Sequence, residues 1–451
     1  MRGLLANIFA TGLRIVTQLA FLPILFAFLA ADEVGWWSMI WAVPAYLTIG
    51  AQGLAAAGAN AALAAEAKAD GLALGTYRRV RRDALVTTAC GWFAVLLLVE
   101  ALISTGHLRD LPLSMDDVRW TAILIGVNAL FSALLAALEV PLRLAGRYPS
   151  HIAFGALAAG AELLGLAVAL MLDGGFLAMA LAVAAARALV WLAAAQTARV
   201  AAPGVFVRTT GTAPSHRLRT AAAAFMLLPL IHALNLQGYV LLVGAVYGAA
   251  VLAAFVATRM LARLFDLFTG FLFSLTYFEA AHISAHGLPQ MRKTAAAATL
   301  VALLAGFVFW AALLLAGPTL QQVWTHEQTI FDPATASVIV LAAILRAIAA
   351  FPSAFLAARN DHMRATVTYL LLSLAGFVAA FVLMLGGAPV WLTLASLTVV
   401  EAVQTVTVLR RFLGATGASA NTFAKQVFSR QALGTLAALC SGLARRRRAH
   451  V

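Results

Sequence analysis

Long apolar runs dominate the sequence and constrain its fold more than any other feature. A run of about 20 apolar residues is long enough to cross a lipid bilayer as one helix. Twelve such runs occur, at residues 4–29, 35–57, 84–104, 120–142, 152–172, 176–197, 221–246, 249–273, 294–316, 336–356, 365–385 and 390–409. The first run is too long for a cleaved signal and contains Arg14, so we interpret it as a retained span. The pattern predicts an all-α integral membrane protein.

Composition agrees with this prediction and excludes other classes. Of the 451 residues, 63% are hydrophobic and only 11% are charged, whereas charged residues make up about 25% of soluble proteins. The two cysteines, Cys90 and Cys440, form neither a disulfide framework nor a metal-binding pattern. No phosphate-binding P-loop is present, so we expect no cofactor, no metal and no ATP-driven mechanism. An ion gradient or a substrate gradient would supply the energy.

The basic residues are distributed in a way that predicts orientation. The net charge of +13 would also fit nucleic-acid binding. However, Lys and Arg concentrate in every second connecting segment, at residues 68–82, 143–147, 199–219, 292–293 and 359–364, and in the tail. Cytoplasmic loops carry this excess in membrane proteins. We therefore predict cytoplasmic termini, with membrane lipids and no nucleic acid as partners.

Six spans in each half predict two six-helix lobes around a central cleft. The lobes are expected at residues 1–200 and 221–412, joined by a cytoplasmic loop at 201–220. The basic tail at 413–451 contains an amphipathic stretch at 421–440, which is either an interfacial helix or disordered. The halves also align weakly: with Leu29 opposite Val246, Gln18 falls opposite Asn235, and each half has a corner after its first span.

Three stretches resemble the Wzx-type O-antigen flippases, a polysaccharide-transport family of the multidrug/oligosaccharidyl-lipid/polysaccharide exporter superfamily. They are FLAADEVGWWSMIW at residues 28–41, a small-residue helix end with a basic loop at 53–85, and the span pair at 235–264. The Asp-Leu-Gly-like element expected after the second span is replaced by Ala51-Gln52-Gly53, which lacks the acid. The resemblance implies an inner-membrane flippase that moves an undecaprenyl-pyrophosphate-linked oligosaccharide outward by alternating access. It also implies polysaccharide polymerase machinery as a partner.

Polar residues recur at helical spacing in the spans that the resemblance places around the cleft. Arg14 and Gln18 lie on one face of the first span, His232 and Asn235 on one face of the seventh, and Arg259, Arg263 and Asp266 on one face of the eighth. Arginine suits pyrophosphate because its planar fork binds phosphate oxygens in pairs. We predict no catalytic residue. The predicted substrate-binding residues are Arg14, Gln18, Asn235, Arg259 and Arg263, and the predicted coupling or gating residues are Asp266, His232 and Glu401.

Each of these residues also has a structural interpretation. Arg263 and Asp266 have the spacing of an ion pair within one helix. Arg187 and Arg346, each alone on an Ala-rich span, are candidates to pair with Glu162 or Glu401. His232 fits an interior hydrogen-bonded histidine, and Glu401 with Gln404 fits a contact between helices.

Three other functions remain open. A multidrug or organic-cation antiporter of the same superfamily needs an acidic cleft, whereas the arginines supply the opposite charge. A lipid II-type flippase usually has fourteen spans rather than twelve. A membrane glycosyltransferase or polymerase needs carboxylates on a large external loop. Asp32 and Glu33 lie instead in a short connection that we interpret as a helix corner, so we do not expect an enzyme.

Overall fold

The computed structural model describes residues 2–67, 72–106, 114–206, 215–266, 288–358 and 363–429. All regular elements in these ranges are helical. Eleven of the described helices are long and apolar enough to cross a membrane. The eighth predicted run, 249–273, continues past residue 266 and so lies partly outside the described residues. The predicted all-α membrane fold with about twelve spans is confirmed.

The chain divides into two compact units, and each is described here by itself. Unit 1 comprises Met1–Ala253 and Trp324–Gln328, and unit 2 comprises Ala254–Val323 and Thr329–Val451. Unit 1 extends past the predicted inter-lobe loop and takes in the seventh span. The predicted lobes and the cleft between them stay a prediction.

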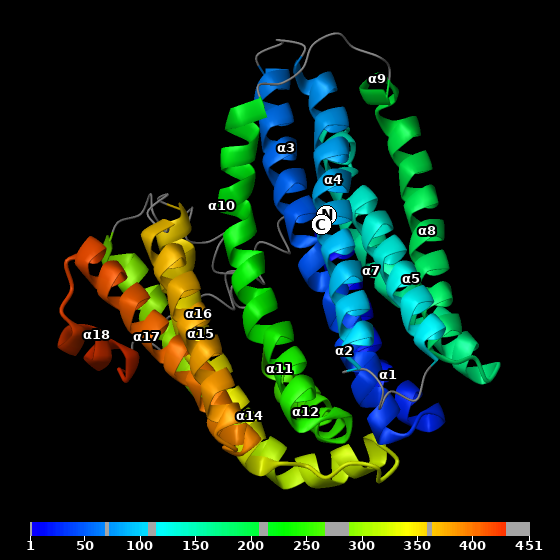
Figure 1. Ribbon diagram of the computed structural model, residues 1–451. Helices are drawn as coiled ribbons and strands as arrows, with labels where there is room; N and C mark the ends of the chain where they lie inside the picture. Colours follow the sequence, from blue (N-terminus) through cyan, green and yellow to red (C-terminus); the bar gives the residue numbers. More distant parts are fainter. Residues whose placement is uncertain are drawn as a thin grey trace. The chain divides into compact units, whose positions relative to one another are not determined.

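Unit 1 is a bundle in which a helix rich in small residues lies at the centre (Figure 1). Its helices are α1 (Arg2–Phe28), α2 (Ala31–Leu47), α3 (Ile49–Ala67), α4 (Leu72–Ser104), α5 (Met115–Ala137), α6 (Glu139–Leu144), α7 (Tyr148–Met171), α8 (Phe176–Ala201), α9 (Pro203–Phe206), α10 (Ser215–Ala233), the π-helical turn η1 (Leu234–Gly238), α11 (Tyr239–Tyr247) and the start of α12 (Ala249–Ala262). Helix α3 packs against α4 and α10, and its buried alanines Ala51, Ala55 and Ala59 permit close approach. Helix α10 therefore belongs to the same bundle as the first six spans.

Two tight corners of unit 1 meet each other. At the first corner, the Glu33 carboxylate accepts the Ala30 N–H at 2.8 Å, so Asp32 and Glu33 lie in the first turn of α2. This confirms the interpretation of the acidic pair as a helix corner. At the second corner, Gly248 adopts a φ of 86°, which only glycine adopts easily. Gly35 of α2 lies so close to the start of α12 that a Cβ there would overlap the Ala249 carbonyl oxygen.

Two spans of unit 1 depart from regular α-helix. The predicted span at 35–57 is interrupted at Thr48, the C-cap of α2, four residues after Pro44. The predicted seventh span contains η1, a π-helical turn that widens the helix and shifts its register. Tyr46 of α2 donates a hydrogen bond of 3.0 Å to the Ala233 carbonyl immediately before η1. The two irregular sites are therefore connected.

Unit 2 continues α12 and adds α14 (Leu288–Trp324), α15 (Pro333–Ala358), α16 (Met363–Leu385), α17 (Val390–Thr416) and α18 (Ala420–Val427). Helix α17 packs against both α15 and α16. Phe412 near its end lies 5.3 Å from Phe355 and 6.2 Å from Phe423, measured between ring centroids. The apolar residues of α18, Phe423 and Val427, are therefore buried within unit 2. The rest of the predicted tail helix, from residue 430, lies outside the described residues.

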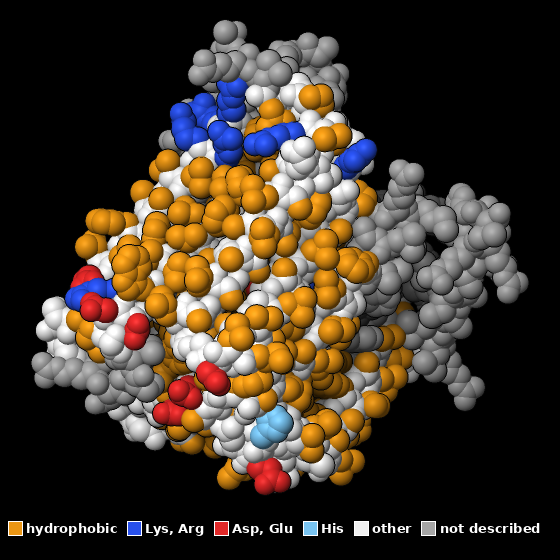
Figure 2. Space-filling view, turned by 90° about the vertical axis from the view of Figure 1, so that its right-hand side faces the viewer, with side chains coloured by type: hydrophobic (Ala, Val, Ile, Leu, Met, Phe, Trp, Pro, Cys, Tyr) orange, Lys and Arg blue, Asp and Glu red, His pale blue; other side chains and the backbone are white. Residues whose placement is uncertain are grey.

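Charge separates along the face shown in Figure 2. Lys and Arg gather at one end, Asp and Glu lie toward the other, and hydrophobic side chains cover the broad region between them. In unit 1 the basic residues of α4 lie in its first turns, whereas Glu100 near its end pairs with Arg119 of α5 at 2.8 Å. The uneven distribution of basic residues that predicts the membrane orientation is therefore also present in the folded protein. Which end faces the cytoplasm stays a prediction.

Candidate functional site

Unit 2 contains a group of linked charged residues inside its predicted membrane region. We call Arg263, Asp266, Arg346, Glu401 and Tyr369 the ion cluster. The Asp266 carboxylate lies 3.3 Å from Arg263 Nε and 2.9 Å from Arg346 Nη1. Arg346 Nη2 also lies 3.0 Å from Glu401 Oε1, and the Tyr369 hydroxyl donates to that oxygen at 2.7 Å. One chain of contacts therefore joins four helical segments.

The helices of unit 2 explain why these residues meet. Arg263 and Asp266 continue the helical turn after α12, where the Asp266 N–H donates to the Arg263 carbonyl at 2.9 Å. Arg346 lies within α15, Tyr369 on α16 and Glu401 on α17. Because α17 packs against both α15 and α16, Glu401 is 1% exposed and faces partners from each. Burying a carboxylate is costly unless it is paired and hydrogen-bonded, and both conditions hold here.

Among the described residues of this part of unit 2, arginines outnumber carboxylates. The ion cluster holds two arginines and two carboxylates. One turn before Arg263, the buried Arg259 adds a third guanidinium, whose Cζ lies 6.0 Å from the centroid of the Phe255 ring. Because Asp266 contacts both Arg263 and Arg346, its single negative charge does not fully neutralise either guanidinium group. The sequence interpretation of Arg263–Asp266 as an ion pair is present, but it is only part of the cluster.

Unit 1 contains a separate buried pair. Arg187 of α8 donates to both carboxylate oxygens of Glu162 on α7, at 2.8 Å and 2.7 Å. Asn128 of α5 donates to Glu162 Oε1 at 2.6 Å and to the Val183 carbonyl at 3.2 Å. The structural interpretation, in which Arg187 and Arg346 pair with Glu162 or Glu401, left the partners open, and the structure pairs Arg187 with Glu162 and Arg346 with Glu401. In unit 1 the pair binds three helices together.

The remaining predicted site residues lie in unit 1. Arg14 is exposed and Gln18 is partly buried on α1. His232 is partly buried at the end of α10, and Asn235 is buried within η1. The structure thus brings together Arg263, Asp266 and Glu401, with Arg259 one turn away. A single cleft shared by all eight residues stays a prediction.

Sequence reasoning missed Tyr369 and the bridging role of Arg346. A usable signal existed for the tyrosine: Tyr369 and Ser373 are spaced one turn apart on an otherwise apolar span, and both are buried. No comparable signal identified Asn128 as a partner of Glu162, because the contact joins residues 34 positions apart.

Comparison with known proteins supports the fold. No family model and no curated protein matches the sequence. Solved structures match over most of the chain. An inward-facing multidrug resistance MATE transporter of the MOP superfamily has a TM-score of 0.68 at 13% identity, covering 89% of this chain and 94% of that chain.

Two further structures differ in function but share the fold. The lipid II flippase MurJ, in an inward closed conformation, has a TM-score of 0.64 at 8% identity, covering 94% of this chain and 89% of that chain. A MOP superfamily transporter from Pyrococcus furiosus, described as having a binding pocket of reversed polarity, has a TM-score of 0.63 at 14% identity, covering 93% and 96%. The chain therefore has the fold of these transporters.

Proposed function

We propose that this protein is a bacterial inner-membrane flippase. Its substrate is an oligosaccharide linked to a lipid through pyrophosphate, and alternating access moves this substrate outward for cell-surface polysaccharide synthesis. The fold supports a transporter because the structures that share it are transporters, including a lipid flippase. It supports no single substrate, since that fold also serves multidrug transport.

The surplus of arginine near the ion cluster is the observation that carries the proposal. Arg259, Arg263 and Arg346 stand against Asp266 and Glu401. Guanidinium groups bind phosphate oxygens in pairs, and a site shielded from water strengthens this contact. A pyrophosphate would supply anionic oxygens for these three arginines.

The geometry also gives a route for reversible binding. Asp266 lies farther from Arg263, at 3.3 Å, than from Arg346, at 2.9 Å. An incoming phosphate oxygen would take Arg263 from Asp266, while Asp266 keeps its contact with Arg346. Competition with an internal carboxylate limits affinity, and a transporter must release its substrate.

A multidrug or organic-cation antiporter is the second candidate, favoured by the similarity to multidrug transporters. Among the described residues, Glu162 and Glu401 are carboxylates buried within spans, and these would receive a cation. Both already accept guanidinium hydrogen bonds, Glu162 from Arg187 and Glu401 from Arg346. A cation would have to displace an arginine from either one. The charge of the described region therefore favours an anionic substrate.

The test is transport by purified protein in proteoliposomes. One arm measures flipping of a fluorescent polyprenyl-pyrophosphate oligosaccharide, and the other measures uptake of ethidium. Arg259→Gln with Arg263→Gln removes two phosphate contacts, each worth about 1.5–3 kcal/mol, and should slow lipid flipping at least tenfold. The control, Arg364→Gln with Arg410→Gln, removes the same charge at exposed positions of unit 2 and should leave transport unchanged.

The outcome separates the candidates. Ethidium uptake without lipid flipping would establish the antiporter instead. Full lipid flipping by the Arg259→Gln, Arg263→Gln variant would show that these arginines do not recognise the substrate.

A further inference from the structure

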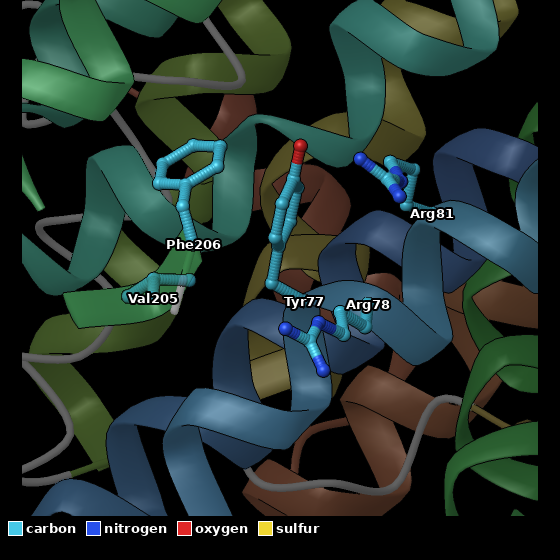
Figure 3. A pocket seen from close by; sticks show the side chains of 5 residues that line it. All are labelled: Tyr77, Arg78, Arg81, Val205 and Phe206. Carbon is cyan, nitrogen blue, oxygen red and sulfur yellow. The ribbon is translucent and has the colours of Figure 1, made fainter. Parts of the chain in front are cut away.

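A polar cavity of about 400 Å³ lies at the basic end of unit 1. It is lined by Tyr77, Arg78 and Arg81 of α4 and by Val205 and Phe206 of α9 (Figure 3). Helix α9 is a single turn after α8 that packs against α4 and α8. The walls of the cavity are therefore formed by the short helix α9 and by the basic start of α4. None of these residues belongs to the predicted transport site.

The aromatic residues give the cavity a fixed shape. The Tyr77 ring is buried and meets Phe206 edge-on, with 5.1 Å between ring centroids. Figure 3 shows Phe206 and Val205 on one side of this ring and Arg81 on the other. The Arg81 guanidinium carbon lies 5.8 Å from the ring centroid, a distance typical of a cation–π contact. The tyrosine is held between an apolar wall and a charged one.

The four arginines at the start of α4 differ in their partners. Arg79 and Arg82 lie 3.8 Å and 3.1 Å from the buried carboxylate of Asp83. Arg78 and Arg81 line the cavity instead, and neither pairs with a carboxylate within the part of the chain that the structure describes. Two positive charges therefore face the cavity without a described counter-ion, although Asp83 is close by in sequence. These two charges favour an anion in the cavity.

The position of the cavity narrows the chemical class of the anion further. Tyr77 lies seven residues before the apolar run at 84–104, about 10 Å along α4. The cavity therefore lies on the headgroup side of this run. Two guanidinium groups and a tyrosine hydroxyl supply several donors, which suits a tetrahedral phosphate better than a planar carboxylate.

We propose that this cavity binds a phosphate group through Arg78, Arg81 and Tyr77. The phosphate is either the headgroup of an anionic phospholipid or a soluble phosphate. Binding here does not depend on the proposed transport substrate, because the residues and the assay are separate from the ion cluster.

The test compares three variants of the full chain. Protein is taken from vesicles of phosphatidylcholine alone or mixed with phosphatidylglycerol, and bound lipid is counted by native mass spectrometry. A second arm titrates inorganic phosphate calorimetrically into protein in detergent. Arg78→Gln with Arg81→Gln should reduce bound phosphatidylglycerol or phosphate affinity at least tenfold. Tyr77→Phe keeps the ring and should reduce it a few-fold without loss of folding.

The control is Arg119→Gln with Arg147→Gln, which removes equal charge from unit 1 outside the cavity, at residues that pair with no buried carboxylate among the described residues. It should bind as the unchanged protein does. Selective retention of phosphatidylglycerol identifies the lipid as the source, and calorimetric binding of phosphate alone identifies a soluble one. The proposal fails if neither probe binds, if the Arg78→Gln, Arg81→Gln variant binds normally, or if the control loses binding equally.

Discussion

At the scale of single residues, two carboxylates buried in the described spans are each held by an arginine. Glu162 and Glu401 are 4% and 1% exposed, and each accepts a guanidinium hydrogen bond. Removing one partner leaves the other as an uncompensated buried charge, which costs more than the pair itself contributes. In either pair, replacing one partner should therefore destabilise the fold more than replacing both partners together.

Arg187→Ala should therefore lower the free energy of unfolding by about 3–5 kcal/mol, since Asn128 alone would remain on Glu162. The combined change Arg187→Met with Glu162→Leu should restore most of the loss. Thermal melting in detergent measures both. Arg119→Ala is the control, because its pair with Glu100 is exposed, and its melting temperature should hardly change. A mild effect of Arg187→Ala would contradict the structural role of the pair.

Residue contacts were predictable from sequence in full only where they are local. Arg263–Asp266 followed from spacing within one helix, whereas for Arg346 the sequence named Glu162 and Glu401 as candidate partners without choosing between them. The contact between Asp266 and Arg346 joins residues 80 positions apart, so spacing along one helix could not predict it. Contacts between helices depend on which faces meet, and an apolar span has few features that specify a face.

At the scale of helices, bilayer length made the spans predictable and left their irregularities hidden. Hydropathy located the long helices, and a Gly after an apolar run located the corner at Gly248. The interruption at Thr48 and the π turn η1 were not predicted, because both lie inside runs whose overall hydropathy fits one continuous span. The Tyr46–Ala233 hydrogen bond connects the two sites, and hydropathy does not report such a contact.

Gly35 provides a test of the crossing between the two corners. Gly35→Ala should destabilise the protein by about 1–3 kcal/mol, because the added Cβ would overlap the Ala249 backbone, which cannot rotate away as a side chain can. Gly155→Ala is the matched control on a helix of the same unit, since a Cβ there meets nothing within 4 Å. That change should be neutral or stabilising. Equal melting temperatures for the two variants would show that α2 and α12 do not cross so closely.

At the scale of the whole molecule, the distribution of charge makes a prediction about orientation. Both termini should lie in the cytoplasm, because the basic end of unit 1 carries the arginines that cytoplasmic loops usually contain. A green fluorescent protein fused after Val451 should fluoresce, and an alkaline phosphatase fused there should be inactive. Active phosphatase would place the C-terminus in the periplasm and reverse the orientation.

Unit 1 is built from two separate stretches of the chain, and this affects how it can fold during synthesis. Unit 1 includes the segment Trp324–Gln328, and the Gln328 amide donates to the carbonyls of Phe26 and Leu29 at 2.9 Å and 3.3 Å. The ribosome must therefore release residue 328 before the corner after α1 acquires these partners. By then α12 and α14 have already been made. Unit 1 begins to emerge from the ribosome first, but it cannot complete its fold until much of unit 2 has also emerged. The two units therefore complete folding together rather than one after the other.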